Sequence, residues 1–275
     1  MTSSRLTQIF GKTTSGRFMP DAPILACQQW ALGYDAPTVL SGINWQLAAQ
    51  SIVALVGQNG VGKSSFLKSI MGLMPAVQGD CYFQGQSLAK RKTVDIARLD
   101  IAYVPQDNAV FNQLTVAEHF ALVNQLPIEV NLQHFPQLQR APQKLAGKLS
   151  GGQRQQLAIA FALASSPLLL LLDEPSANIQ PSIVEQLTET LSDIHQQTGL
   201  AIILAEQNLS MISQLANTAY LIEPERFIET PIPIDTTDPK QLSEALSSLS
   251  SLSTLSALSD LAGHQTGLTN PAKRG

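Results

Sequence analysis

The sequence predicts an α/β domain whose core is a parallel sheet. Apolar runs of strand length alternate with segments in which apolar residues recur at helical spacing. The run 168–172 is five consecutive leucines, typical of a strand buried on both faces of a parallel sheet. Another run, 51–56, leads into the glycine-rich loop GQNGVGKSS at 57–65 and then into a helix. Because strand, glycine-rich loop and helix in this order make a P-loop, we expect phosphate to bind there.

Composition sets the general class. The chain has 275 residues, 44% of them apolar, which is enough for a sizeable core. A net charge of −4 argues against nucleic acid as a partner. Cys27 and Cys81 are far apart in sequence and lack metal-ligand spacing, so we expect reduced thiols packed in strands rather than a disulfide. Neither a membrane-spanning run nor a signal-peptide core is seen, which predicts a cytosolic chain that can dock on a membrane protein.

The elements expected before the insert follow from local patterns. Residues 1–22 are polar and are expected to be a mostly disordered leader. The domain is expected to span 23–228 and to begin with three short strands between 23 and 56. After the P-loop helix we expect a strand at 79–83, a helix at 94–99 and a strand at 101–104.

A mostly helical insert is expected at about 107–166. Thr115, with Glu118 three residues later, predicts a capping box for a helix reaching Gln125. Ser150 opens a second helix, which Pro167 ends.

The sheet pattern then resumes. After 168–172 come a helix from Pro181 to Gly199, a buried strand at 200–204, a helix at 209–216 and two edge strands near Tyr220 and Phe227. Within residues 229–275, leucines recur at every third position from Leu246 to Leu261. These wind around a helix without making one face, and the serines favour disorder, so we expect a low-complexity tail, with a docking helix as the alternative.

The P-loop predicts nucleotide binding through its backbone and two side chains. Its glycines let N–H groups surround phosphate oxygens at a helix N-terminus. Lys63 supplies a charge for the β- and γ-phosphates, and the Ser64 hydroxyl can ligate Mg²⁺. The alternative, a glycine-rich turn that matches by chance, is disfavoured by the flanking strand and helix. The expected nucleotide-binding residues here are Gly57, Gln58, Asn59, Gly60, Gly62, Lys63, Ser64 and Ser65.

Polar residues elsewhere complete the predicted site. Asp173 ends the five-leucine strand, where ligands bind in α/β sheets, and is expected to hold Mg²⁺. Glu174 is the expected general base, the alternative being that both acids cap the next helix. Gln106, after the strand at 101–104, is placed to reach the metal or the attacking water.

A second phosphate-binding device is predicted at the start of the helix that Ser150 opens. Its hydroxyl and the following glycine N–H groups lie at a helix N-terminus, although an ordinary serine cap is the alternative. One nucleotide needs one P-loop, so this second device suggests a site shared between two subunits. Its residues are Ser150, Gly151, Gly152 and Gln153.

The P-loop, a glutamine after a strand, LSGGQ, and an apolar strand ending in Asp-Glu, in this order over about 23–227, resemble the ATPase subunit of an ABC transporter. The resemblance implies a P-loop NTPase of the ABC-ATPase type, with an antiparallel β subdomain and a helical signature subdomain. It implies ATP and Mg²⁺, and an ATP-sandwich dimer in which Ser150 to Gln153 of one subunit contact the γ-phosphate held by the other. It also implies that Tyr34 stacks on adenine, and that a permease helix docks beside 106–120; for Tyr34 the alternative is a strand-edge tyrosine.

Finer motifs resemble the second ATPase subunit of importers for branched-chain amino acids and for urea or short-chain amides. These are IAYVPQ, VFNQLTVAEH, LAGKLSGGQ and ILAEQN. The implied partners are transmembrane permease subunits, a second ATPase and, indirectly, a periplasmic or extracellular solute-binding protein, with the chain peripheral on the cytoplasmic face of the membrane. Exporters of lipid or polysaccharide share the same cassette and remain an alternative. Cassettes with coiled-coil arms are excluded, because the interval from Ser64 to Ser150 is too short for arms.

Two departures from the family pattern bear on activity. Residues 176–180 read SANIQ where the family commonly has SAGLD, and Gln207 stands where the switch histidine is expected. Gln207 is a candidate catalytic residue that can donate a hydrogen bond to a γ-phosphate oxygen, but it is uncharged and does not titrate near neutral pH. We therefore predict weak or partner-dependent hydrolysis in a heterodimer with unequal sites. A homodimer, or an ATP-gated clamp that hardly turns over, is the alternative.

Overall fold

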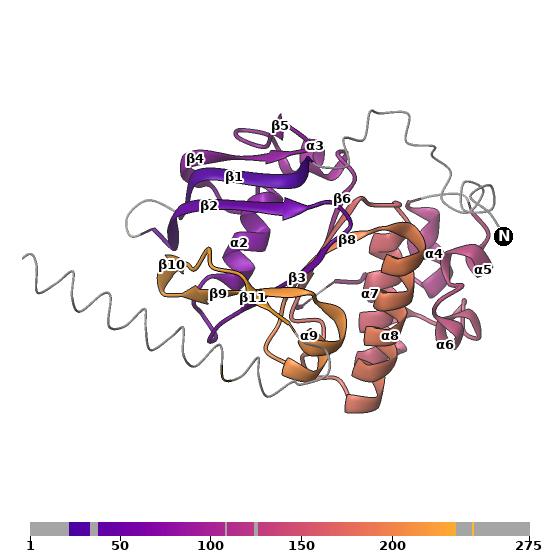
Figure 1. Ribbon diagram of the computed structural model, residues 1–275. Helices are drawn as coiled ribbons and strands as arrows, with labels where there is room; N and C mark the ends of the chain where they lie inside the picture. The colour runs from indigo at the N-terminus through magenta and orange to yellow at the C-terminus, as the bar shows by residue number, and fades with distance from the viewer. Residues whose placement is uncertain (1–21, 34–37, 108, 124–125, 235–243, 245–275) are drawn as a thin grey trace, which may run out of the picture.

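The computed structural model describes residues 22–33, 38–107, 109–123, 126–234 and 244 (Figure 1). Nearly all of the expected leader, residue Tyr34 and most of the expected tail lie outside these described residues. Among the described residues, no helix has the length and apolar character needed to cross a membrane.

A parallel layer forms the centre of the fold. Its neighbouring strands run in the order β9-β3-β8-β7-β6, and every pair is parallel. The strands are β3 (Ile52–Val56), β6 (Ile101–Val104), β7 (Leu169–Asp173), β8 (Ala201–Ala205) and β9 (Thr218–Glu223). The sequence therefore predicted the parallel core correctly.

An antiparallel layer continues the sheet on one side. It consists of β1 (Pro23–Leu32), β2 (Leu40–Ala48), β4 (Ala76–Phe83) and β5 (Gln86–Ser87), in the order β5-β4-β1-β2. The short strand β10 (Glu225–Phe227) joins the layers, because it pairs with β2 on one side and with β9 on the other. The first three strands confirm the expectation for 23–56.

The strand β3 is buried on both faces, and its two faces belong to different cores. Ile52, Ala54 and Val56 pack in the core that includes α7 (Gly151–Leu163), α8 (Pro181–Thr198) and α9 (Leu209–Leu215). Val53 and Leu55 pack in the core that includes α2 (Lys63–Ile70) and the antiparallel strands. The P-loop that follows β3 is therefore anchored between two cores.

Aromatic rings tie α2 to the antiparallel layer. The Phe66 ring lies 5.6 Å, centroid to centroid, from both Trp30 and Trp45, and 5.3 Å from Phe227. These rings come from β1, β2, α2 and β10. Edge-to-face and stacked ring pairs add to the burial energy of such clusters. The helix whose N-terminus completes the P-loop is thus fixed by side chains far from it in sequence.

The insert is helical, as predicted. Besides α7 it contains α4 (Val116–Ala121), α5 (Ile128–Asn131), α6 (Pro136–Gln139) and a 3₁₀ turn at Ala146–Lys148, and these lie beside α7 and α8 (Figure 1). Thr115 caps α4 in a capping box with Glu118, as expected, but the helix ends at Ala121 rather than Gln125.

Three features differ from the expectation. Neither strand expected at an edge is one: β9 lies between β3 and β10, and β10, which contains Phe227, lies between β9 and β2. Strand β11 (Ile232–Pro233) pairs with β9, so the sheet continues past residue 228. The short helix α3 (Thr93–Ala97) begins and ends earlier than 94–99.

The two cysteines lie side by side despite their separation in sequence. Cys27 and Cys81 face each other across the β1–β4 pair, with 3.3 Å between their sulfur atoms, and both are free and buried. Burial, with a smaller contribution from Cys81, raises the pKa of the Cys27 thiol. They are thus thiols packed in strands, as expected.

Candidate nucleotide site

At Gly57, the P-loop backbone packs so closely against the sheet that only glycine fits there. Gly57 has φ +152°, and a Cβ built there would lie 2.2 Å from the carbonyl oxygen of Ile222 in β9. Gly62, with φ +114°, is the residue before α2, which begins at Lys63. At Gly60, with φ +83°, a Cβ would meet nothing within 4 Å. The loop therefore wraps closely against the sheet while its tip stays open.

Lys63 is held inside this loop. Its ammonium Nζ donates to the carbonyl oxygens of Gly57 and Gln58 at 2.8 and 2.9 Å, and it lies 3.9 Å from the carboxylate of Glu174. Burial lowers the pKa of Lys63, while the carboxylates of Glu174, Asp173 and Glu206 act in the opposite direction. The side chain is a desolvated cation at a loop that can receive phosphate.

Two hydroxyls hold the carboxylate of Asp173. Ser64 donates to its Oδ1 at 2.8 Å, and Tyr103 donates to its Oδ2 at 2.9 Å. Burial, followed by the charge of Asp173, raises the pKa of the Tyr103 phenol. The sequence reading missed Tyr103, although it lies in the strand that leads to Gln106.

The oxygens of Ser64 and Asp173 suit Mg²⁺, which prefers oxygen ligands and keeps several waters. No cluster of three or more His, Cys, Asp or Glu side chains that could hold a metal occurs in the part of the chain that the structure describes. A Mg²⁺ ion here would take one or two protein ligands and the remainder from phosphate and water, as is usual for this ion.

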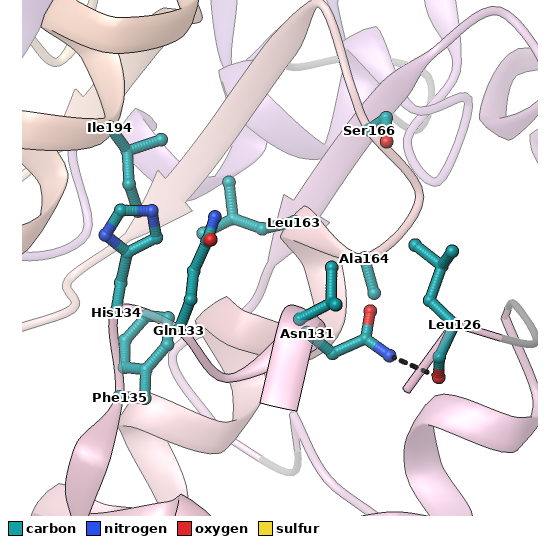
Figure 2. A pocket seen from close by; sticks show the side chains of 10 residues that line it. Leu126, Asn131, Gln133, His134, Phe135, Leu163, Ala164, Ser166 and Ile194 are labelled. Carbon is teal, nitrogen blue, oxygen red and sulfur yellow. Dashed lines mark hydrogen bonds between the residues drawn. The ribbon is translucent and has the colours of Figure 1, made fainter. Parts of the chain in front are cut away.

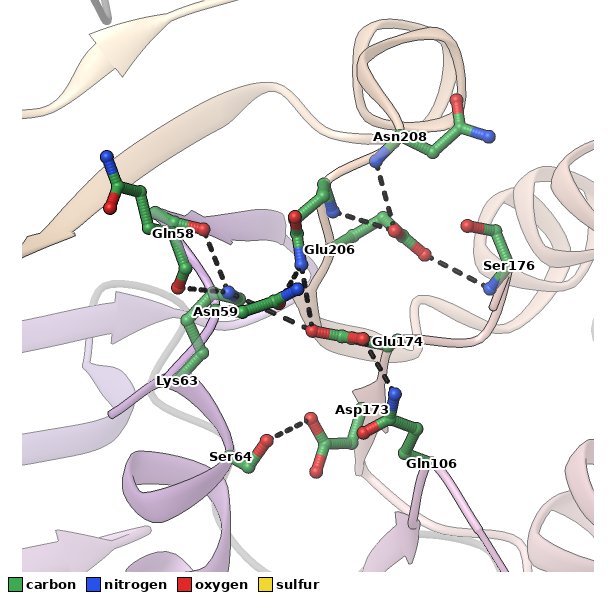
Figure 3. Close-up of polar contacts among 12 residues, drawn as sticks. Gln58, Asn59, Lys63, Ser64, Gln106, Asp173, Glu174, Ser176, Glu206 and Asn208 are labelled. Atoms are coloured by element: carbon green, nitrogen blue, oxygen red, sulfur yellow. Dashed lines mark hydrogen bonds and ion pairs between the residues drawn. The ribbon is translucent and has the colours of Figure 1, made fainter. Parts of the chain in front are cut away.

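Amide side chains surround the carboxylate of Glu174 (Figure 3). Gln106 donates to its Oε2 at 2.8 Å, and Gln207 donates to its Oε1 at 3.1 Å. Gln207 also donates to the side-chain oxygen of Asn59. Glu174 itself has φ +46°, which side-chain-bearing residues rarely adopt. The structure thus brings together residues from four separate loops that were predicted from sequence alone.

The signature residues make a separate arrangement. Ser150 is the N-cap of α7, and its hydroxyl and backbone N–H both bond to Gln153 in a capping box. A Cβ on Gly152 would lie 2.8 Å from Ile183 of α8, whereas one on Gly151 would meet only the Asn178 carbonyl, at 3.6 Å. The hydrogen bonds of this capping box thus join Ser150 and Gln153, which lie only three residues apart.

The remaining predicted residues have modest roles in these contacts. Gln58 contributes its carbonyl to Lys63, and the carbonyl of Ser65 accepts from Ser69 within α2. Tyr34 lies outside the described residues.

A hollow between the insert and α8 is too small for a nucleotide. It has a volume of about 40 Å³, which is room for a few waters only (Figure 2). Asn131 donates to the Leu126 carbonyl at 3.4 Å beside it. It is lined by Leu126, Val130, Asn131, Gln133, His134, Phe135, Leu163, Ala164, Ser166 and Ile194.

Sequence comparison shows the family. A family profile described as ABC transporter matches residues 40–177, about half of the chain. The chain belongs to the ABC transporter family. It contains that family's ATP-binding domain, which in this family hydrolyses ATP and works with transmembrane permease components.

Relatives within the family come from several transport systems. The ABC domain is 35% identical over 203 residues to the high-affinity branched-chain amino acid transport ATP-binding protein BraG of Pseudomonas aeruginosa, covering 71% of this chain and 87% of that one. It is 34% identical to a probable branched-chain amino acid transport ATP-binding protein, LivF, of Archaeoglobus fulgidus, covering 69% and 84%. It is 28% identical to the lipopolysaccharide export system ATP-binding protein LptB of Haemophilus influenzae, covering 80% and 95%.

Solved structures show the same fold. A nucleotide-free ATP-binding cassette from an ABC transporter matches with a TM-score of 0.71 at 18% identity, covering 82% of this chain and 96% of that one. The cbiO1 protein of Clostridium perfringens, part of the ABC transporter complex cbiONQ, matches with a TM-score of 0.68 at 25% identity, covering 90% and 100%. The ABC-ATPase fold expected from the sequence is confirmed.

Proposed function

We propose that the chain is the ATP-hydrolysing subunit of an importer for branched-chain amino acids, urea or a short-chain amide. The observation that carries the solute class is the identity of 34–35% to two branched-chain amino acid transport proteins. The second candidate is a lipid or polysaccharide exporter subunit, supported by the 28% identity to LptB.

The chemistry rests on three groups of residues. The residues of 57–65 bind the ATP phosphates, with Lys63 as the cation among them. Ser64 and Asp173, with Gln106 nearby, would hold Mg²⁺, which would neutralise charge on the phosphates. Glu174 takes the proton of the attacking water, and its position beside Lys63 and between two amides supports this role.

Gln207 stands where the family has a histidine that can titrate, and it supplies an uncharged amide donor in its place. Its amide already bonds to Glu174 and to Asn59, so it orients the base without adding charge. We therefore expect slow hydrolysis by the chain alone. A second ATPase that carries a histidine at this position would form the faster site of a heterodimer.

A complete site needs a second subunit. Ser150 to Gln153 of the partner would contact the γ-phosphate held by Lys63, and the capping box of α7 is the donor-rich end that would face it. Tyr34 remains the proposed adenine contact.

The permease surface is proposed to lie beside α7. A hollow of about 240 Å³ there is lined mainly by residues of β6 and α7, with Pro105, Ala109, Val123 and Ser165. The ring of Phe111, which is 55% exposed, lies 6.4 Å from that of Phe161 in the lining. An apolar hollow with an exposed aromatic residue suits a short helix of a permease. The solute-binding protein would act indirectly, through the permease, and the chain would sit on the cytoplasmic face of the membrane.

Replacement Glu174→Gln tests the enzyme itself. We expect ATP turnover to fall by at least about 100-fold, because the base is lost, while ATP binding and an ATP-bound dimer persist. Glu185→Gln on the exposed face of α8 is the matched control. Unchanged turnover in Glu174→Gln would favour the ATP-gated clamp over the enzyme.

Two further measurements test the partner and the solute. The ATPase rate of the chain alone is compared with its rate after mixing with the second ATPase; a full rate alone would rule out the heterodimer. Vesicles holding the assembled transporter are then offered labelled leucine, urea or a short-chain amide. ATP-dependent movement of lipid, with uptake of none of these solutes, would favour the exporter.

A further inference from the structure

Glu206 is a buried carboxylate between the two loops that carry Glu174 and Gln207. The residue is 3% exposed and directly follows β8. Its Oε1 accepts from the backbone N–H groups of Gln207 and Asn208, at 2.7 and 3.0 Å. Its Oε2 accepts from the backbone N–H of Ser176 at 3.1 Å (Figure 3). One side chain thus joins the segment after β7 to the segment after β8 with charge-assisted hydrogen bonds.

The first of these segments needs support because its backbone is strained. Glu174 has a φ of +46°, and strained backbone persists only where its surroundings hold it. Its N–H donates to the carbonyl of Ala205 at 2.8 Å, one residue before Glu206. The bond from Ser176 to Glu206 fixes the chain two residues later. Hydrogen bonds therefore hold the backbone both at Glu174 and two residues after it, and this fixes the direction of the Glu174 side chain.

The second segment is fixed by the same carboxylate. The backbone N–H of Gln207 bonds to Glu206, while the side chain of Gln207 reaches Glu174 and Asn59. Helix capping does not account for this contact, because the side chain of Asn208 already caps α9 by accepting from Met211 at 3.2 Å. A local cap would also not extend to Ser176, on the preceding loop.

We propose that Glu206 is a positioning residue that sets Glu174 and Gln207 in their mutual geometry for hydrolysis. The inference rests on the roles proposed above for these two residues. Glu206 acts through their backbones and does not touch the nucleotide. A carboxylate is required because both of its oxygens accept; an amide offers one oxygen and directs an NH₂ group at a backbone N–H.

The test replaces Glu206 in the full chain by Gln and, separately, by Asp. Gln keeps the length and loses one acceptor, whereas Asp keeps the charge and is too short to reach both loops. For both we expect kcat for ATP to fall about tenfold with KM within twofold of the wild type, because base alignment is lost and phosphate binding is kept. Glu189→Gln, with the same charge change on the exposed face of α8, should leave both constants unchanged.

Hydrogen exchange supplies a readout that does not depend on turnover. In the nucleotide-free chain, the amides of Ser176, Gln207 and Asn208 should exchange faster in both Glu206 variants, while those of β3 keep their wild-type rates. Wild-type kcat in both variants, or unchanged exchange at these amides, would overturn the proposal. Faster exchange in β3 than in the wild type identifies a misfolded variant, and the other variant then decides. If Glu174→Gln retains turnover, the proposed function fails, while the exchange data still test the connection made by Glu206.

Discussion

The P-loop side and the signature side of this chain are built differently, although both present a helix N-terminus. On the P-loop side, Asp173 bonds to Ser64 and Glu174 bonds to Gln106, and Glu174 also lies 3.9 Å from Lys63, so these contacts join distant parts of the sequence. On the signature side, Ser150 bonds to Gln153, three residues away. The first side is organised by the tertiary fold before any ligand binds. The second is organised locally, and in the proposed dimer it contacts nucleotide held by another subunit.

The largest expected effect tests the P-loop side. Replacement Gly57→Ala puts a Cβ against the Ile222 carbonyl, so either the loop or β9 must move. We expect loss of ATP binding and a free energy of unfolding lower by about 2–3 kcal/mol, measured with a fluorescent ATP analogue and by denaturant unfolding. Gly60→Ala, which has only backbone strain, should cost about 1 kcal/mol. Equal losses in the two variants would mean that the contact with β9 is unimportant.

A smaller effect is expected when one amide is removed from Glu174. Gln207→Ala deletes the hydrogen bonds to Glu174 and Asn59. We expect kcat to fall about tenfold, equivalent to about 1.4 kcal/mol, with little change in ATP affinity. Steady-state kinetics of the assembled transporter provide the measurement. A loss confined to ATP affinity would show that Gln207 binds phosphate and does not orient the base.

Variants of the adjacent Gly151 and Gly152 on the signature side distinguish packing within the subunit from the proposed contact between subunits. Gly152→Ala crowds Ile183 of α8, so we expect unfolding to become easier by about 1 kcal/mol. Gly151→Ala has room, so the isolated subunit should keep its stability while ATP-dependent dimerisation weakens. Thermal unfolding and size-exclusion chromatography with ATP measure the two effects. Weaker stability in Gly151→Ala would contradict a role outside the subunit.

The smallest effect concerns the charge of Lys63 on the P-loop side. The signature residues Ser150 to Gln153 carry no charge. Burial lowers the pKa of Lys63 below 10.5, so the cost of its charge is present at neutral pH and is lost as pH rises from the lowered pKa towards 10.5. Glu174→Gln removes a carboxylate that raises this pKa, and should lower it further. A lysine ¹³Cε NMR titration of the nucleotide-free chain measures both. Titration of Lys63 together with the exposed lysines would contradict its desolvation.

Local patterns were enough to predict most elements and most of the residues that the structure brings together at the candidate site. The five leucines before Asp173 predict a buried strand, and the glycines before Lys63 predict a P-loop; each pattern lies within a few residues. Patterns that depend on sheet order were less informative. The strand β9 has a mixed apolar and polar sequence typical of an edge, yet it lies between β3 and β10. Tyr103 and Glu206 were missed as site residues because their partners, Asp173 and Ser176, are brought to them only by the fold.

The cysteine pair has a practical consequence for measuring whether two such subunits close around ATP, as proposed. The chain contains two cysteines, and both are buried against each other between β1 and β4. A thiol introduced on the exposed face of α8 would therefore be the one that a maleimide dye modifies in the folded protein. Distances between dyes on two subunits could then be followed during turnover, without first replacing either native cysteine.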